Sequence, residues 1–218
     1  MIRRPPRSTQ GVSSAASDVY KRQPLGLALI GVVLTFGSLD LQEITRAQGG
    51  LIADWIPAWG IIYQPVAFII LLTAGIAESK RIPFDLPEAE SELISGYFTE
   101  YSGAKQAMFM LGDFVEAIIV AGLITTLFFG GWQVPFLLRD GFHFPWGGFV
   151  ALPSLLVTLL QVGSFTGKVL FFCWLQIMIR WTLPRFRYDQ LMTLGWKILL
   201  PLSLANVMVT ALAILLLE

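Results

Sequence analysis

Long apolar runs separated by polar connectors divide the chain from Pro24 onward. The runs cover approximately residues 24–39, 59–77, 105–130, 152–179 and 197–217. A helix needs about 20 apolar residues to cross a bilayer core of roughly 30 Å, and all but the first run reach about that length. Because lipid offers backbone amides no external hydrogen-bond partner, such runs predict helices. The pattern therefore predicts an all-α, polytopic transmembrane protein with about five spans.

The first 23 residues, MIRRPPRSTQGVSSAASDVYKRQ, do not fit this pattern. A basic start before an apolar run is typical of a signal peptide, but no small-residue cleavage site followed by a soluble domain comes after it. We expect residues 1–23 to be a disordered, non-native stretch joined to a chain already under way. The short run at 24–39 would then be a truncated span. Residues 24–218 would form the C-terminal portion of a larger membrane subunit.

The distribution of Lys and Arg predicts the orientation of the spans. With five spans, connectors 78–104 and 180–196 share one side, and with their flanks they hold Lys80, Arg81, Lys105, Arg180, Arg185, Arg187 and Lys197. The opposite connectors, 40–58 and 131–151, hold only Arg46 and Arg139. Positive charges favour the cytoplasmic side, so both richly polar connectors are expected in the cytoplasm. They could build one site.

Composition agrees with a membrane protein and excludes some functions. Hydrophobic residues make up 55% of the chain, and its mean hydropathy is +0.68. After residue 23 the chain holds 10 basic and 14 acidic residues, which disfavours a nucleic-acid partner. Cys173 is the single cysteine, so it forms no intramolecular disulfide and cannot anchor a metal alone. His143, the single histidine, lies in a Gly/Pro/aromatic loop and is interpreted as an ordinary loop residue.

The connector after the second run is rich in carboxylates. It reads AESKRIPFDLPEAESELISGYFTEYSGAK and contains Glu78, Asp85, Glu88, Glu90, Glu92 and Glu100. In one interpretation Asp85 caps a helix, with Glu88 completing a capping box and Glu90 complementing the helix dipole. Yet Glu88 and Glu92 are four apart, and like charges at this spacing destabilise a helix. A functional role would explain why this connector contains Glu88 and Glu92 in spite of their mutual repulsion.

Two further carboxylates, Asp113 and Glu116, lie within the apolar run 105–130. Each would cost about 2.5–3.5 kcal/mol at the centre of a transmembrane helix. They could snorkel to an interface or pair with another helix, and Lys168 offers a cation. It precedes Arg180 by twelve residues, about 18 Å of helix, which places it near mid-bilayer if Arg180 marks the interface. A facing cation would keep the acids ionised, and without one they would bind protons near neutral pH. Either state suits a charge relay.

Two long segments carry a resemblance to a known family. ESKRIPFDLPEAESELISGYFTEYSG and RWTLPRFRYDQLMTLGWKILLPLSLAN resemble the signature segments of the H-subunit family of proton-pumping NADH:quinone oxidoreductase, respiratory complex I. The likeness runs from about Gly26 to Glu218. In this family the two loops help to form the chamber where a quinone such as ubiquinone enters from the bilayer and is reduced. The acidic loop resembles the start of the proton-coupling path.

The resemblance implies roles for two sets of residues. The proton-coupling set is Glu78, Glu88, Glu90, Glu92, Glu100 and Asp113, to which the charges inside the spans add Glu116 and Lys168. The set around the quinone chamber is Arg81, Phe84, Asp85, Arg185, Arg187 and Asp189. Two positions depart from many relatives, because Asp113 stands where Glu is common and Phe98 where His is frequent. The shorter side chain at 113 would lengthen one relay step.

The resemblance also implies cofactors, partners and location. The subunit would bind no cofactor of its own; quinone would be a substrate, while NADH, FMN and iron–sulfur clusters would belong to partner subunits of the membrane and peripheral arms. Location would be the bacterial inner membrane of the respiratory chain, and the fragment would be inactive alone. Two alternatives remain: a membrane subunit of an energy-converting hydrogenase-type complex, or an ion-coupled secondary transporter using Asp113, Glu116 and Lys168. The near-complete PFDLPEAESEL and PRFRYDQLM segments favour the quinone enzyme, and no visible repeat supports a transporter.

Overall fold

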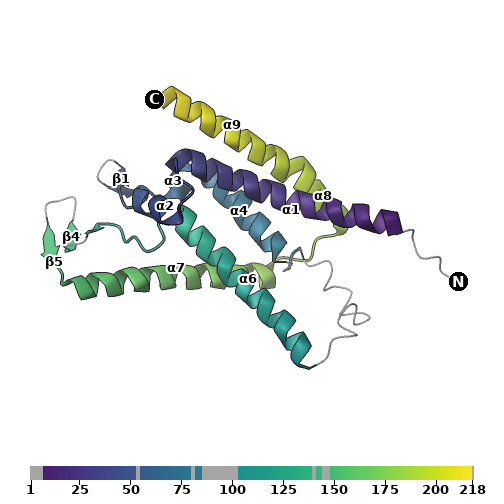
Figure 1. Cartoon of the computed structure of the whole chain (residues 1–218), viewed down its shortest axis with the longest axis horizontal. Coiled ribbons are helices and arrows are strands. Elements are labelled where there is room, and N and C mark those ends of the chain that lie inside the picture. Colours follow the sequence, from purple (N-terminus) through teal and green to yellow (C-terminus); the bar gives the residue numbers. More distant parts are fainter. Residues whose placement is uncertain are drawn as a thin grey trace.

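Helices dominate the computed structural model, which describes residues 7–52, 55–79, 82–84, 103–138, 141–143 and 148–217 (Figure 1). The helices are α1 (Arg7–Phe36), α2 (Leu41–Ala47), α3 (Gly60–Tyr63), α4 (Pro65–Glu78), α6 (Ala104–Phe128), α7 (Ser154–Thr182), α8 (Tyr188–Thr193), the π-helical η2 (Leu194–Leu199) and α9 (Leu200–Leu217). The described strands form two small antiparallel sheets in the connectors. They are β1 (Leu51–Ile52) with β2 (Ile56–Pro57), and β3 (Leu137–Leu138), β4 (Gly141–His143) and β5 (Phe149–Ala151) in that order. The predicted all-α membrane class is confirmed.

Within the described residues, three helices are long and apolar enough to cross a membrane: Ala104–Phe128, Ser154–Thr182 and Asp189–Leu216. The end of α1 and α2 form a pair bent by 56°, which gives a fourth if the pair is one span. The predicted span at 59–77 differs, because Gln64 has a non-helical backbone and separates α3 from α4. Pro65 then begins α4, whose 14 residues extend only about 21 Å. Alone, α4 is too short to cross the core.

The N-terminal segment also differs from expectation. We expected disorder over residues 1–23, but Arg7–Gln23 continue α1 into the apolar part of the chain through Pro24. Residues 1–6 lie outside the described part, and the foreign origin of the segment stays a prediction.

Helix α1 packs along α4 and α9, while α6 packs against α4 and is crossed by α7 (Figure 1). The largest buried cluster joins these helices, with Val32 from α1, Ile70 from α4, Ile124 and Phe128 from α6, and Phe172 from α7. Small residues allow close approach, as is usual between transmembrane helices. A Cβ added to Gly75 of α4 would lie 2.7 Å from Cγ1 of Val120 in α6.

Polar side chains tie the ends of these helices together. At the break before α4, the Gln64 amide nitrogen donates to the Gly31 carbonyl and to the hydroxyls of Thr35 and Thr210, at 2.7–3.2 Å. The Gln64 oxygen accepts from the amide of Asn206 at 2.9 Å. This network joins α1, α4 and α9. Hydrogen bonds between membrane helices contribute about 0.6 kcal/mol each on average.

A second buried glutamine, Gln48, closes the C-terminal end of α6. Its amide nitrogen donates to the carbonyls of Thr126 and Leu127 at 3.1 and 3.0 Å. Its oxygen accepts from the backbone N–H groups of Gly60 and Gly130 at 3.1 and 2.8 Å. Gln48 is 1% exposed, so each of these backbone groups depends on it.

Replacing Gln48 with Leu should destabilise the full-length subunit by about 2 kcal/mol or more, because buried backbone groups left without a partner cost about 1–3 kcal/mol each. Thermal unfolding in detergent measures the loss. Gln42→Leu is the matched control, since Gln42 lies on the same short helix with an exposed side chain. Its effect should stay within about 0.5 kcal/mol. Equal midpoints for the two variants would contradict the assigned role of Gln48.

Candidate functional site

The described ends of the two polar connectors lie together, as the orientation of the spans predicts. The rings of Phe84 and Phe186 have centroids 5.6 Å apart, and the backbone N–H of Phe186 donates to the carbonyl of Pro83 at 3.1 Å. Beneath them a buried cluster contains Ile76 and Ala77 from the end of α4, together with Leu191 from α8. Phe84, which the resemblance assigns to the chamber loops, is therefore a packing residue that joins the two connectors. Which side of the membrane they face stays a prediction.

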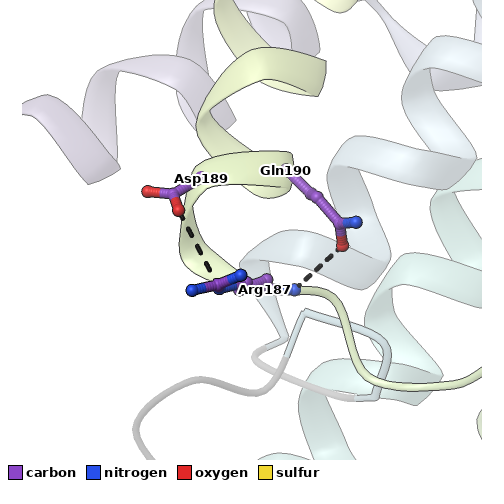
Figure 2. Close-up of polar contacts among 3 residues, drawn as sticks. All are labelled: Arg187, Asp189 and Gln190. Carbon is purple, nitrogen blue, oxygen red and sulfur yellow. Dashed lines mark hydrogen bonds and ion pairs between the residues drawn. The ribbon is translucent and has the colours of Figure 1, made fainter.

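Charged residues surround this junction and stay accessible. Arg187 and Asp189 approach to 3.9 Å, and each side chain is 83% exposed (Figure 2). The backbone N–H of Arg187 donates to the Gln190 side chain at 3.2 Å, which supports the first turn of α8 (Figure 2). An ion pair this exposed contributes little stability. Arg187 and Asp189 can therefore turn toward a ligand or a partner at little cost. Arg185 is partly buried beside them and makes further contacts.

Glu78 stands where α4 ends and the acidic connector begins. Its carboxylate lies 3.6 Å from the guanidinium of Arg22 in α1. The Glu78 side chain is 33% exposed and that of Arg22 is 69% exposed. This pair joins the segment that we predicted to be foreign to the mouth of the candidate site.

Most of the predicted carboxylates fall in the undescribed part of the acidic connector. Arg81, Asp85, Glu88, Glu90, Glu92 and Glu100 lie outside the described residues. Asp113 belongs to α6, but its side chain is also outside them. Glu116, three residues further along α6, is partly buried and engaged in contacts. Both positions lie within a helix that can span a membrane, about 14 and 18 Å from its start.

Lys168 does not pair with the carboxylate of α6 for which it was considered as a partner. Its ammonium donates to three backbone carbonyls, those of Phe129, Gly131 and Gln133, at 2.7–3.1 Å, and lies 5.1 Å from the Trp59 ring centroid. Phe129 caps the C-terminus of α6, thirteen residues or about 20 Å beyond Glu116. An ion pair with Glu116 is excluded at that distance. The C-terminal end of a helix carries a partial negative charge, which explains the attraction of a cation.

Gln176 is a buried polar residue that the sequence patterns did not single out. It lies on α7, is 4% exposed, and its amide nitrogen donates to the Ala117 carbonyl of α6 at 3.3 Å. This contact fixes the amide orientation and directs Oε1 away from the carbonyl. Oε1 is buried and has no hydrogen-bond partner in the described part of the chain. Buried acceptors of this kind usually bind an ordered water or another donor.

The sequence carried a signal for two of the three buried glutamines that were missed. Gln64 and Gln176 each interrupt an apolar run, where a polar side chain requires a partner on another helix. Gln48 lies in a polar connector and had no such signal. Among the residues with described structure, no three His, Cys, Asp or Glu side chains come close enough to hold a metal ion.

A family model described as NADH dehydrogenase matches residues 11–211. The chain belongs to the NADH dehydrogenase family. It is 43% identical over 215 residues to the H subunit of NADH-quinone oxidoreductase from Bdellovibrio bacteriovorus, covering 92% of this chain and 56% of that protein. Identity is 48% over 199 residues with an H subunit from Koribacter versatilis, and 45% over 207 residues with subunit 8 from Rhodothermus marinus. These alignments cover 91% and 94% of this chain and 52% and 58% of the relatives. The chain spans about half the length of the curated relatives it matches.

Variants at Lys168 distinguish a structural role of this residue from a role in proton transfer. Lys168→Met should lower the unfolding midpoint of the full-length subunit, because three carbonyls lose their donor. Lys168→Arg should retain most of the stability, since the guanidinium offers five N–H donors but does not release a proton near neutral pH. Normal assembly of Lys168→Arg with abolished proton translocation would return Lys168 to the relay.

Proposed function

We propose that this chain is part of the membrane subunit of a proton-pumping NADH:quinone oxidoreductase, in which the joined loops form one wall of the quinone-reduction chamber. Membership of the family and the names of the bacterial relatives support the proposal. The observation that carries it is the contact of Phe84 and Pro83 with Phe186, which unites the two polar connectors at one end of the helices. The surrounding membrane would be the bacterial inner membrane.

The junction combines surfaces suited to a quinone. Partly buried apolar side chains packed against this cluster, including Ile179 and Met192, continue from the spans and suit an isoprenoid tail. Arg187 and Asp189 supply exposed polar groups for the carbonyl oxygens of the head group. Reduction to quinol consumes two electrons and two protons. The electrons would come from NADH through FMN and iron–sulfur clusters in partner subunits, and this chain would supply binding and protons.

The coupling path would lead from this junction along the acidic connector into α6. Glu78 and the carboxylates Glu88, Glu90, Glu92 and Glu100 would titrate as a coupled set, so that a charge change at the quinone shifts protons among them. Asp113 and Glu116 extend the series into the span. The unpartnered oxygen of Gln176 beside Ala117 supports an ordered water next to Glu116, between α6 and α7. We leave Lys168 out of the path.

The triple variant Glu92→Gln, Glu100→Gln and Asp113→Asn tests the relay. In the assembled complex with the full-length subunit it should reduce quinone-linked proton translocation severalfold, because an amide cannot take up and release the proton. NADH:quinone turnover and proton translocation are measured together in sealed vesicles. Asp113→Glu should keep activity, since it preserves a carboxylate.

Glu43→Gln is the matched control for the carboxylate series. Glu43 is an exposed carboxylate on α2, at the other end of the helices, and accepts a hydrogen bond from Ser38. Its loss should leave pumping unchanged. Full pumping by the triple variant in a normally assembled complex would refute the relay assignment.

The proposed function also predicts how the subunit is oriented in the membrane, with the joined loops on the cytoplasmic side. In a Cys173→Ser background, Thr193→Cys should react with an impermeant thiol reagent from the cytoplasmic side, and Glu43→Cys only from the opposite side. Glu43 and Thr193 are both exposed, so access depends mainly on the side of the membrane. Labelling of both cysteines from one side would contradict the topology.

A further inference from the structure

A surface groove lies at the end of the helices away from the joined loops. It consists of two adjoining hollows of about 630 and 540 Å³. Both are lined by Trp132, Thr158 and Gln161, so they form one continuous groove. Helix α7 forms its floor, with α2 and the end of α6 on the other side. Each hollow falls in the volume range of about 300–1,000 Å³ that is usual for ligand sites.

The lining becomes more apolar along α7. The first hollow mixes polar and apolar side chains, and to the shared residues it adds Arg46, Gln133 and Ser154 together with Gly49, Leu137 and Val157. The second adds Thr126 and the apolar Leu41, Val162 and Phe165. From Ser154 to Phe165 the helix rises about 16 Å, so the two ends of the groove are well separated. Trp132 lies where they join, and tryptophan favours the boundary between lipid and water.

Arg46 places a positive charge at the polar end. Its side chain is exposed, and no carboxylate in the described part of the chain forms an ion pair with it. The two acids nearest in sequence have other hydrogen-bond partners: Asp40 accepts from the backbone N–H of Gln42, and Glu43 accepts from Ser38. Arg46 therefore remains available to an anion, and a guanidinium matches the geometry of a phosphate.

We propose that this groove binds an anionic phospholipid, with the phosphate at Arg46 and one acyl chain along Val162 and Phe165. A soluble phosphate would leave the apolar half without a function, and a neutral quinone would gain nothing from the cation. An apolar helix of a partner protein would not match the polar half. An amphiphile with a negative head group complements both ends. The site is separate from the joined loops and goes beyond the proposed function.

Photocrosslinking tests the site in the assembled complex containing the full-length subunit. The probes are phosphatidylglycerol and phosphatidylcholine, each with a diazirine on one acyl chain, and labelled peptides are identified by mass spectrometry. Phosphatidylglycerol should label residues 158–165. Arg46→Gln should reduce this labelling about fivefold, the effect of removing one cation near a lipid head group, and should change phosphatidylcholine labelling little. Lys197→Gln, which removes an exposed cation from the other end of the spans, should leave labelling unchanged.

A second pair of variants tests the apolar half of the groove. Val162→Trp fills it and should reduce phosphatidylglycerol labelling severalfold. Leu159→Trp is matched, because Leu159 and Val162 lie on the same helix and are both 58% exposed, yet Leu159 does not line the groove. Its labelling should equal that of the unmodified complex. Equal labelling by the two lipids, equal effects of the two Trp variants, or capture of a neighbouring protein in place of lipid would overturn the proposal.

Discussion

The C-terminal carbonyls of α6 are the constraint around which the described structure is arranged. A helix leaves its last carbonyls without internal partners, and within a membrane protein these groups must be satisfied by other parts of the chain. The carbonyl of Thr125 accepts from two backbone N–H groups of the following turn. The Gln48 amide donates to the next two carbonyls, those of Thr126 and Leu127. The Lys168 ammonium donates to the carbonyl of Phe129 and to those of Gly131 and Gln133 in the following loop. A short helix and a transmembrane helix are thereby fixed to one point.

This arrangement separates the molecule into two ends with different chemistry. At one end, backbone groups are satisfied by buried Gln and Lys side chains, so the connectors there are held tightly to the helices. At the other end, among the described residues, an aromatic contact and a backbone hydrogen bond join the loops, and Arg187 and Asp189 beside them are exposed. The described contacts therefore differ in kind, with buried side chains bonded to backbone groups at one end and a ring packed on a ring at the other.

The sequence predicted the class of the fold, because apolar runs in a membrane protein leave few alternatives. It also predicted that the two polar connectors share one side of the membrane, since two spans separate them and both are rich in Lys and Arg. The sequence did not predict features that depend on the tertiary contacts of a single side chain. The break at Gln64 depends on a tertiary network with Asn206 and Thr210 that no local pattern reveals. Lys168 was considered as a possible partner for Asp113 and Glu116, but its ammonium donates to three backbone carbonyls at and beyond the C-terminus of α6.

The π-helical stretch η2 sets the rotational phase of the last helix. A π turn holds roughly one residue more than an α turn, and one residue corresponds to about 100° of rotation around an α-helix. Without the extra residue, the face of α9 that carries Asn206 and Thr210 would rotate away from Gln64 and toward lipid. The π turn therefore accommodates one additional residue, and this residue keeps the polar face of an otherwise apolar helix directed toward the protein interior.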